Sequence, residues 1–306
     1  MTDIPKRRLG RTGVDVTVLG FGAFELRGEP TGPPVGDREA EELLNAALDA
    51  GMNLIDTSID YGRSEELVGR FISHRRSEYF LASKCGCVVG AAQLEHVHTA
   101  ENVRRGVENS LRLLRTDHLD IVQFHLSLTR EELERDGALE EAMKLRQEGK
   151  VRFVGSSGTL PNLLEQIEMG VFDVFQIPYS ALQREHETAI TKAAAAGAGT
   201  IIRGGVAKGA PTDWNRVAGY MVGPETMKDR WEEAKLDQLL DGMSRMEFML
   251  RFTLAHPDLD AAIVGTKNLA HLRDNIEAAK KEPLPADMVA EAKRRLDAVG
   301  AVAEPV

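Results

Sequence analysis

The stretch DIVQFHLSLTREELERDGALEEAMKLRQEGKVRFVGSS, residues 120–157, decides the fold class. It opens with the short apolar run DIVQFHL (120–126), continues through the helix-like segment LEEAMKLRQEG (139–149) and closes with a second run, VRFVGSS (151–157). Both runs are nearly continuous in apolar residues, which is typical of strands buried on both faces of a parallel sheet. A strand, a helix and a strand in this order predict a right-handed parallel crossover.

The same unit recurs along the chain. Six further apolar runs are VTVLGFGAF (16–24), NLIDTS (53–58), YFLASKC (79–85), DVFQIPYS (173–180), TIIRGG (200–205) and AAIVGT (261–266). Further helix-like segments lie at 37–51, 100–115 and 243–257, and several of the helix-like segments end in Gly or Pro. Eight such strands predict an α/β fold, a single (β/α)8 TIM barrel. No linker rich in Ser, Gly or Pro divides it, so we expect one domain over residues 1–306.

Three pieces fall outside the repeat. RRLGRTGVDVT (7–17) has a turn with glycine between two β-prone arms, which predicts an N-terminal β-hairpin that caps the barrel floor. The stretch from Gly209 to Asp241 is longer than an ordinary βα connection, and we expect it to close over the active face. A C-terminal helix completes the expected fold.

Composition excludes several classes of protein. The 306 residues include 38 basic and 48 acidic side chains, a net charge of −10, so a nucleic-acid partner is not expected. The N-terminus MTDIPKRRLG has no apolar run typical of a secretory signal, and no stretch approaches the roughly 20 apolar residues of a membrane span. With two cysteines, Cys85 and Cys87, a disulfide framework is excluded, which favours a cytoplasmic protein. We expect a monomer or a simple homo-oligomer.

Polar side chains gather at the ends of three successive predicted strands. Asp56 ends the second strand, with Tyr61 five residues later; Lys84 ends the third, and His125 the fourth. Taken singly, Asp56 could cap a turn, Tyr61 could pack a loop, Lys84 could be solvated and His125 could be a core histidine. Because the active face of such a barrel lies at the carboxyl ends of its strands, the four side chains are expected to converge on one cavity.

Together these four groups form a proton-transfer device. A tyrosine pKa near 10 is too high for easy proton exchange at neutrality, and the Lys84 ammonium is expected to favour the phenolate of Tyr61. Asp56 would hold Lys84 charged, and His125 would donate a hydrogen bond to a substrate oxygen.

In order along the chain, LIDTSIDYGRSEELVG, LASKCG, IVQFH and AIVGTKNLAHLRDN resemble the aldo-keto reductase superfamily, and the match runs over most of the sequence. The resemblance implies a catalytic tetrad of Asp56, Tyr61, Lys84 and His125, with Tyr61 as general acid in reduction and general base in oxidation. It further implies direct hydride transfer between a nicotinamide and an aldehyde or ketone carbon, without a metal.

The resemblance also implies a cofactor site. Ser156, Ser157 and Gln176 would bind the nicotinamide carboxamide, although family members usually have Asn in place of Ser157. Arg203 stands where the family often has a stacking aromatic residue, and its planar guanidinium can stack too. Gly204 and Gly205 would permit close approach of the backbone to the pyrophosphate. Gly22 and Ala23 would flank the cofactor, and Phe24 would line the substrate pocket beside Tyr61 and His125.

The segment GTKNLAHLRDN resembles the part of the family that binds the adenosine phosphate. Gly265, Thr266 and Lys267 lead into a helix, whose N-terminus attracts phosphate, and Lys267 adds the charge expected for a 2′-phosphate. His271 would meet the same phosphate and Asn275 the adenine. NADP(H) is therefore predicted in preference to NAD(H).

Two motifs have other interpretations. The segment GFGAFELRG (20–28) lacks the complete fingerprint of a dinucleotide-binding Rossmann site. Cys85 and Cys87, with His96 and His98 downstream, suggest a metal, but CxC is shorter than the usual C-x2-C spacing and HxH lies in a variable connection. We therefore predict no metal and expect these side chains to line the pocket rim.

Two other functions use the same residues. Lys84 could form a Schiff base with a carbonyl substrate, as in an aldolase or lyase, but GTKNLAHLRDN would then lack a purpose. Alternatively, the barrel could hold NADP as a redox sensor or regulatory subunit with little turnover, a reading favoured by Ser157 and Arg203 and opposed by the intact tetrad. The substrate itself is not predictable, because the loops that build the pocket vary without changing the chemistry.

Overall fold

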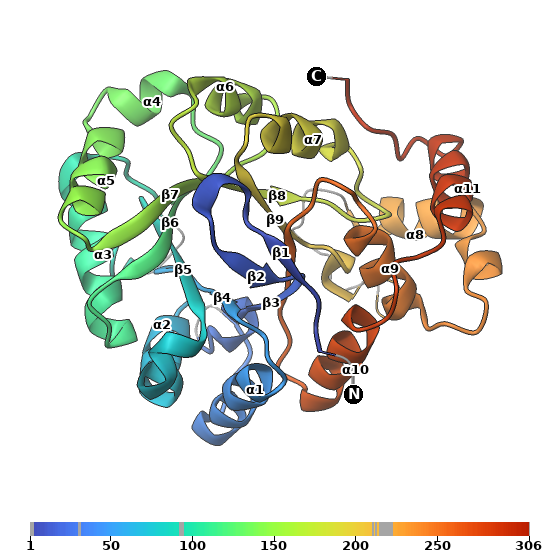
Figure 1. Cartoon of the computed structure of the whole chain (residues 1–306), viewed down its shortest axis with the longest axis horizontal. Helices are drawn as coiled ribbons and strands as arrows, with labels where there is room; N and C mark the ends of the chain where they lie inside the picture. The colour runs from blue at the N-terminus through green and yellow to red at the C-terminus, as the bar shows by residue number, and fades with distance from the viewer. Residues whose placement is uncertain are drawn as a thin grey trace.

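The computed structural model describes residues 3–29, 32–91, 95–209, 211, 213 and 223–305. Eight parallel strands close into a barrel in the order β10-β3-β4-β5-β6-β7-β8-β9, and helices ring the strands (Figure 1). The strands are β3 (Leu19–Gly22), β4 (Leu54–Asp56), β5 (Phe80–Cys85), β6 (Leu119–His125), β7 (Val151–Ser157), β8 (Val174–Pro178), β9 (Gly199–Arg203) and β10 (Ala261–Val264). This architecture confirms the predicted (β/α)8 fold.

The helices follow the strands as the apolar pattern predicts. Thr99 and Ser244 accept hydrogen bonds from the amides of Asn102 and Glu247, which fixes where α3 and α9 begin. The α-helices are α1 (Asp37–Asp49), α2 (Ser64–Ile72), α3 (Ala100–Leu114), α4 (Arg130–Glu134), α5 (Ala138–Gln147), α6 (Asn162–Met169), α7 (Glu187–Ala195), α8 (Pro224–Glu233), α9 (Arg245–Leu254), α10 (Leu269–Ala279) and α11 (Ala286–Asp297). The last of these is the expected C-terminal helix.

One predicted strand divides in two. The run at 16–24 contributes its first residues to β2 (Asp15–Thr17), which pairs antiparallel with β1 (Lys6–Arg8), and the barrel strand β3 begins at Leu19. The division falls at Val18, whose amide donates to Pro5 and not along the barrel. An apolar pattern cannot reveal this change of partner, because Val16 and Thr17 of β2 are as buried as the residues of β3.

The β1–β2 hairpin closes the floor of the barrel (Figure 1). Leu9 and Val16 are buried in one apolar cluster with Leu54, Ile121 and Ile201 from the barrel strands. The amide of Gly10 donates to Asp260 Oδ2 at 3.1 Å, and the amide of Arg11 donates to the carbonyl of Gly197 at 2.8 Å. The floor is therefore filled by side chains and tied to two strand-end loops, which leaves the opposite end for a ligand.

The long stretch from 209 to 241 contains a packed helical part. Its described residues form α8 and the short helix η6 (Leu236–Leu239). Trp231 is fully buried against Phe248 of α9, and its ring nitrogen donates to Asp237 at 3.1 Å. Residues 210, 212 and 214–222 of this stretch lie outside the described residues, and the expected closure over the active face stays a prediction.

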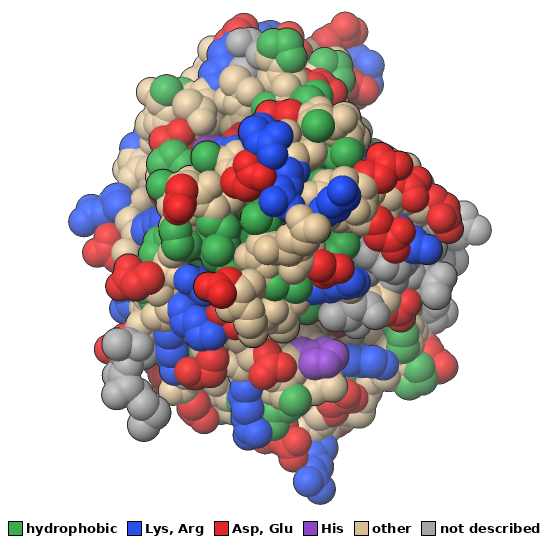
Figure 2. Space-filling model, turned by 90° about the vertical axis from the view of Figure 1, so that its right-hand side faces the viewer, with side chains coloured by type: hydrophobic (Ala, Val, Ile, Leu, Met, Phe, Trp, Pro, Cys, Tyr) green, Lys and Arg blue, Asp and Glu red, His purple; other side chains and the backbone are tan. Residues whose placement is uncertain are grey.

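The surface of the side that carries α8 and α11 is mixed in charge. Figure 2 shows acidic and basic side chains interspersed there instead of gathered into a single basic field. In the described part of the chain, no helix combines the length and the apolar character needed to cross a bilayer.

Candidate active site

Three neighbouring strands bring the predicted catalytic residues to one end of the barrel. Asp56 is the last residue of β4, Lys84 lies near the end of β5 and His125 is the last residue of β6. Tyr61 lies in the loop between β4 and α2. Parallel strands carry their carboxyl ends to the same rim, so side chains far apart in sequence meet there.

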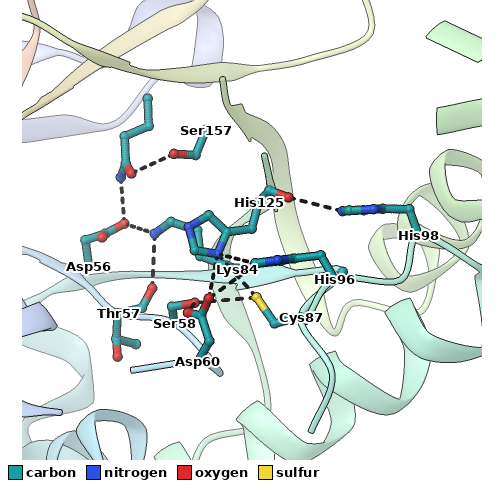
Figure 3. Close-up of polar contacts among 12 residues, drawn as sticks. Asp56, Thr57, Ser58, Asp60, Lys84, Cys87, His96, His98, His125 and Ser157 are labelled. Carbon is teal, nitrogen blue, oxygen red and sulfur yellow. Dashed lines mark hydrogen bonds and ion pairs between the residues drawn. The ribbon is translucent and has the colours of Figure 1, made fainter. Parts of the chain in front are cut away.

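A buried ion pair joins Asp56 and Lys84. Lys84 Nζ lies 2.6 Å from Asp56 Oδ1 and donates a second hydrogen bond to the carbonyl of Thr57 at 3.0 Å (Figure 3). The same carboxylate oxygen accepts from the amide groups of Gln123 at 3.0 Å and Gln176 at 2.8 Å. Three donors on one oxygen compensate the loss of water around this carboxylate. The predicted pairing of Asp56 with Lys84 is present.

Tyr61 lies beside this pair without a hydrogen bond to it. Its ring centroid is 6.0 Å from Lys84 Nζ and 5.0 Å from the ring of Phe24. Burial raises the pKa of the Tyr61 hydroxyl well above its ordinary value, and the Asp56 and Asp60 carboxylates raise it further, whereas Arg203 lowers it. The Lys84 ammonium is bonded to Asp56 in this structure, and the lowering of the Tyr61 pKa by Lys84 stays a prediction from the sequence.

His125 takes part in a second polar group. Its Nδ1 lies 3.2 Å from Asp60 Oδ2, 3.3 Å from Cys87 Sγ and 3.3 Å from His96 Nε2. Burial would raise the pKa of Asp60, yet hydrogen bonds from His125 and His96 hold it well below its usual range. Burial raises the pKa of the Cys87 thiol to about 12, and burial lowers that of His125 although Asp60 opposes it.

A cavity of about 760 Å³ opens beside Asp56 and Tyr61. This volume is in the range of small-molecule and cofactor sites. Its walls come from the carboxyl ends of the strands and from α9 and α10, so the cavity extends from the barrel mouth to the cleft between these two helices. The predicted site residues that line it are Gly22, Phe24, Asp56, Tyr61, Gln176, Arg203, Gly204, Gly205, Gly265, Thr266, His271 and Asn275.

Other predicted residues lie apart from this cavity. Ser157 Oγ donates to Gln176 Oε1 at 3.0 Å, whereas Ser156 Oγ faces α6 and donates to Gln166 at 2.7 Å. Ala23 is buried, and neither Lys84 nor His125 is among the residues that line the cavity. Lys267 borders a different groove, with Glu39, Glu42 and Asn268. The structure therefore separates Ser156 and Lys267 from the cavity.

The sequence of the chain is similar to proteins of one known family. A model described as Aldo/keto reductase family matches residues 18–297. The chain belongs to this family. Among curated relatives, it is 30% identical to L-galactose dehydrogenase of Arabidopsis thaliana, over 100% of this chain and 96% of the relative. It is 27% identical to the uncharacterized oxidoreductase YqkF of Bacillus subtilis, with 91% and 92% covered.

A solved structure agrees with the fold of this aldo/keto reductase. The holo form of an aldo-keto reductase from Bacillus halodurans superposes with a TM-score of 0.83, covering 99% of this chain and 98% of that chain at 24% identity. At this identity the likeness concerns the fold.

The cavity of this aldo/keto reductase fits a dinucleotide in two respects. The Nε of Arg203 is buried and has no hydrogen-bond partner among the described residues, so it remains available to a ligand. A Cβ on Gly265 would lie 2.5 Å from the carbonyl oxygen of Gly22, so this part of the wall admits only backbone. A guanidinium donor and a close backbone approach are suited to a nicotinamide and a pyrophosphate.

The end of the cavity beside α10 differs from the sequence-based expectation for an adenosine phosphate site. The side chain of Asn268 caps α10 and accepts from the amides of Ala270 at 2.8 Å and His271 at 3.4 Å, so two of the N-terminal donors are already used. His271 and Lys281 line the cavity, and Lys281 Nζ pairs with Glu247 at 2.8 Å. Asp274 and Glu277 line the same end, so this end carries both signs of charge.

Sequence reasoning missed the charged lining residues Glu247, Asp274, Glu277 and Lys281, and it also missed Gln123 and Asp60. Gln123 precedes His125 by two residues in β6, so it points to the same side of the strand; a polar residue inside an apolar run was the available signal. Asp60 precedes Tyr61, and its sequence position offers no comparable signal. Its meeting with Cys87 and His96 depends on how two loops fold against each other.

Proposed function

We propose that this chain is an NADP(H)-dependent oxidoreductase that reversibly reduces an aldehyde or a ketone to an alcohol, with Tyr61 as general acid and base. The observation that carries the proposal is the position of Tyr61 on the wall of the cavity that Gln176 and Arg203 also line, beside the buried pair of Asp56 and Lys84. A proton donor next to a dinucleotide-sized cavity is the arrangement that carbonyl reduction needs.

The residues have distinct proposed roles. The nicotinamide supplies a hydride to the carbonyl carbon when the cofactor is bound. Tyr61 gives its hydroxyl proton to the carbonyl oxygen, so that an alcohol forms, and regains a proton from solvent. Asp56 and Lys84 form a fixed ion pair beside Tyr61. His125 orients the substrate oxygen by a hydrogen bond. In oxidation Tyr61 accepts the alcohol proton.

The proposed cofactor is NADP(H), with NAD(H) as the alternative. Lys267 lies outside the cavity, so the attraction for a 2′-phosphate falls to His271 and Lys281. Glu247, Asp274 and Glu277 oppose it, because carboxylates repel a phosphate and accept from ribose hydroxyls. Both cofactors therefore belong in the first assay, and the ratio of their dissociation constants measures the balance of these charges.

The first experiment measures loss of reduced-nicotinamide absorbance with a panel of aldehydes and ketones, and its gain with alcohols. Aldoses belong in the panel because a relative is named L-galactose dehydrogenase. Wild type is compared with Tyr61→Phe and with the matched control Tyr79→Phe, whose hydroxyl faces the carbonyl of Ile72 on the outside of the barrel. We expect Tyr61→Phe to bind NADPH and to lose at least a hundredfold in kcat, on the order of what one general acid contributes.

Other outcomes identify the alternatives. Tight NADPH binding without turnover in wild type would favour a redox sensor. Full turnover in Tyr61→Phe would refute the role of Tyr61. A Schiff base on Lys84 is disfavoured because its ammonium is fully buried and bonded to Asp56, and borohydride trapping of a substrate on the enzyme would reverse that conclusion.

A small-molecule carbonyl or alcohol is the proposed substrate, within one catalytic domain. The cytoplasmic location, the absence of nucleic-acid partners and the state of a monomer or simple homo-oligomer stay predictions from the sequence.

A further inference from the structure

Four potential metal ligands meet beside the proposed catalytic site. Asp60 Oδ2, Cys87 Sγ, His96 Nε2 and His125 Nδ1 all lie within 4.8 Å of one another. Figure 3 shows the four side chains pointing toward a common point, whereas His98 lies on the far side of His96 and bonds the carbonyl of His125. They come from three loops and strand ends: after β4, after β5 and at the end of β6.

The spacing of these atoms matches a tetrahedral zinc site. Ligand atoms roughly 2.0–2.3 Å from a zinc ion at tetrahedral angles lie about 3.3–3.7 Å from one another. The distance from His96 Nε2 to His125 Nδ1 is 3.3 Å, and Asp60 Oδ2 lies 3.2 Å and 3.3 Å from these two nitrogens. Cys87 Sγ lies 3.3 Å from His125 Nδ1. Four of the six distances among the ligand atoms are therefore close to those around a tetrahedral ion, and all six lie within 4.8 Å.

Hydrogen bonds among the four groups explain their convergence less completely than a bound cation does. A neutral histidine nitrogen carries at most one proton, yet His125 Nδ1 faces an oxygen, a sulfur and a nitrogen at nearly equal distances. One proton can satisfy one of these neighbours. A cation at the common point would interact with all four.

The ligand set also suits zinc chemically. One thiolate and one carboxylate neutralise a divalent ion, and two neutral imidazoles complete a tetrahedron of soft and borderline ligands. Ser58 Oγ donates to the other oxygen of Asp60 at 2.5 Å, which orients that carboxylate as an outer-sphere partner should. The antiparallel bridge between Cys87 and His96 fixes these two ligands on one loop.

We infer that Asp60, Cys87, His96 and His125 form a binding site for a zinc ion. Binding forms four coordinate bonds and releases the Cys87 thiol proton to solvent, with no oxidation or reduction. The inference replaces the sequence-based expectation of no metal and assigns Cys87 and His96, but neither Cys85 nor His98, as ligands.

The ion acts on His125 through its tautomer. A metal on Nδ1 leaves the proton on Nε2, so that nitrogen is always a donor. This consequence rests on the proposed function, in which His125 donates to the substrate oxygen. The metal touches neither substrate nor cofactor, and so it is a positioning device for His125.

Cobalt substitution tests the site without any need for activity. The full chain, freed of any affinity tag and stripped with a chelator, is titrated with cobalt(II). We expect one equivalent per chain, intense visible bands of tetrahedral cobalt and a near-ultraviolet thiolate-to-cobalt band, all displaced by zinc. The thiolate band should vanish in Cys87→Ala, and cobalt affinity should fall at least tenfold in both Cys87→Ala and His96→Gln.

Matched variants guard against nonspecific effects. Cys85→Ala and His98→Gln change the neighbouring cysteine and histidine and should keep the cobalt spectrum, while circular dichroism confirms folding of every variant. No cobalt bands in wild type, or bands that survive Cys87→Ala, would overturn the site. Chelation should lower kcat of wild type but leave Cys87→Ala unaffected; an unchanged wild-type kcat beside an intact cobalt spectrum would overturn the role in positioning His125 alone.

Discussion

Glu65 offers the sharpest quantitative test of the packing behind the candidate active site. It lies in α2, fully buried, where its Oε1 accepts from Ser83 Oγ on β5 at 2.6 Å and its Oε2 has no hydrogen-bond partner among the described residues. Burial raises the pKa of Glu65 from 4.5 to about 7 and the Asp60 carboxylate adds to the rise, whereas Ser83, Ser110 and Lys84 oppose it. Replacing Glu65 by Gln removes the titration and keeps the shape.

The sign and size of the effect follow from linkage. The pKa of Glu65 is higher in the folded protein than in the unfolded chain, where it is near 4.5. The contribution of Glu65 to the free energy of unfolding is therefore highest below pH 4.5, falls as the pH rises toward 7 and stays low above pH 7. The shift corresponds to about 3 kcal/mol at 1.36 kcal/mol per pKa unit. Between pH 5 and pH 8, the unfolding free energy of Glu65→Gln relative to wild type should therefore rise by about 2–3 kcal/mol.

Urea unfolding at a series of pH values measures this difference. Glu66→Gln is the matched control, since Glu66 is the adjacent residue and half-exposed; its difference from wild type should change by less than about 0.5 kcal/mol over the same range. A flat difference for Glu65→Gln between pH 5 and pH 8 would refute the argument that the charge of this buried carboxyl is only partly compensated in the folded protein.

Two further substitutions test the stability of the barrel and the place where the cofactor binds. Asp120 is buried and accepts hydrogen bonds from Arg76 at 2.6 Å, from Arg152 at 2.6 Å and from the amide of Leu81 at 2.9 Å. Asp120→Ala should therefore lower the free energy of unfolding by about 2–4 kcal/mol. Substitution of the exposed Asp117 by Ala serves as control, and a loss below about 1 kcal/mol in Asp120→Ala would contradict the role of this network. Gly265→Ala would place a Cβ 2.5 Å from the Gly22 carbonyl oxygen and should weaken NADPH binding, followed by fluorescence titration, at least tenfold, about 1.4 kcal/mol. Gly36→Ala, where a Cβ meets nothing within 4 Å, should leave NADPH affinity unchanged, and equal affinities for both variants would argue against the cofactor lying along Gly22 and Gly265.

The barrel itself was predictable from local pattern. Strands buried on both faces need continuous apolar runs, and helices that cover them need amphipathic ones, so the sequence carries both periods directly. Asp56, Lys84 and His125 were predictable because each stands at the end of such a run, and strand ends converge in a barrel. The split between β2 and β3 was not, since pairing partners leave no mark on residues that are buried either way.

The sequence by itself determined which strands form, in which order, and which polar groups reach the rim. Only the tertiary structure decided what those groups face: it brings the amides of Gln123 and Gln176 to Asp56, turns Lys267 away from the cavity and gathers Asp60, Cys87, His96 and His125 around one point. The physical reason is that a strand end is set by apolar periodicity. The direction of a side chain beyond it is set by loop packing, hydrogen bonds and charges contributed by segments far away in the sequence.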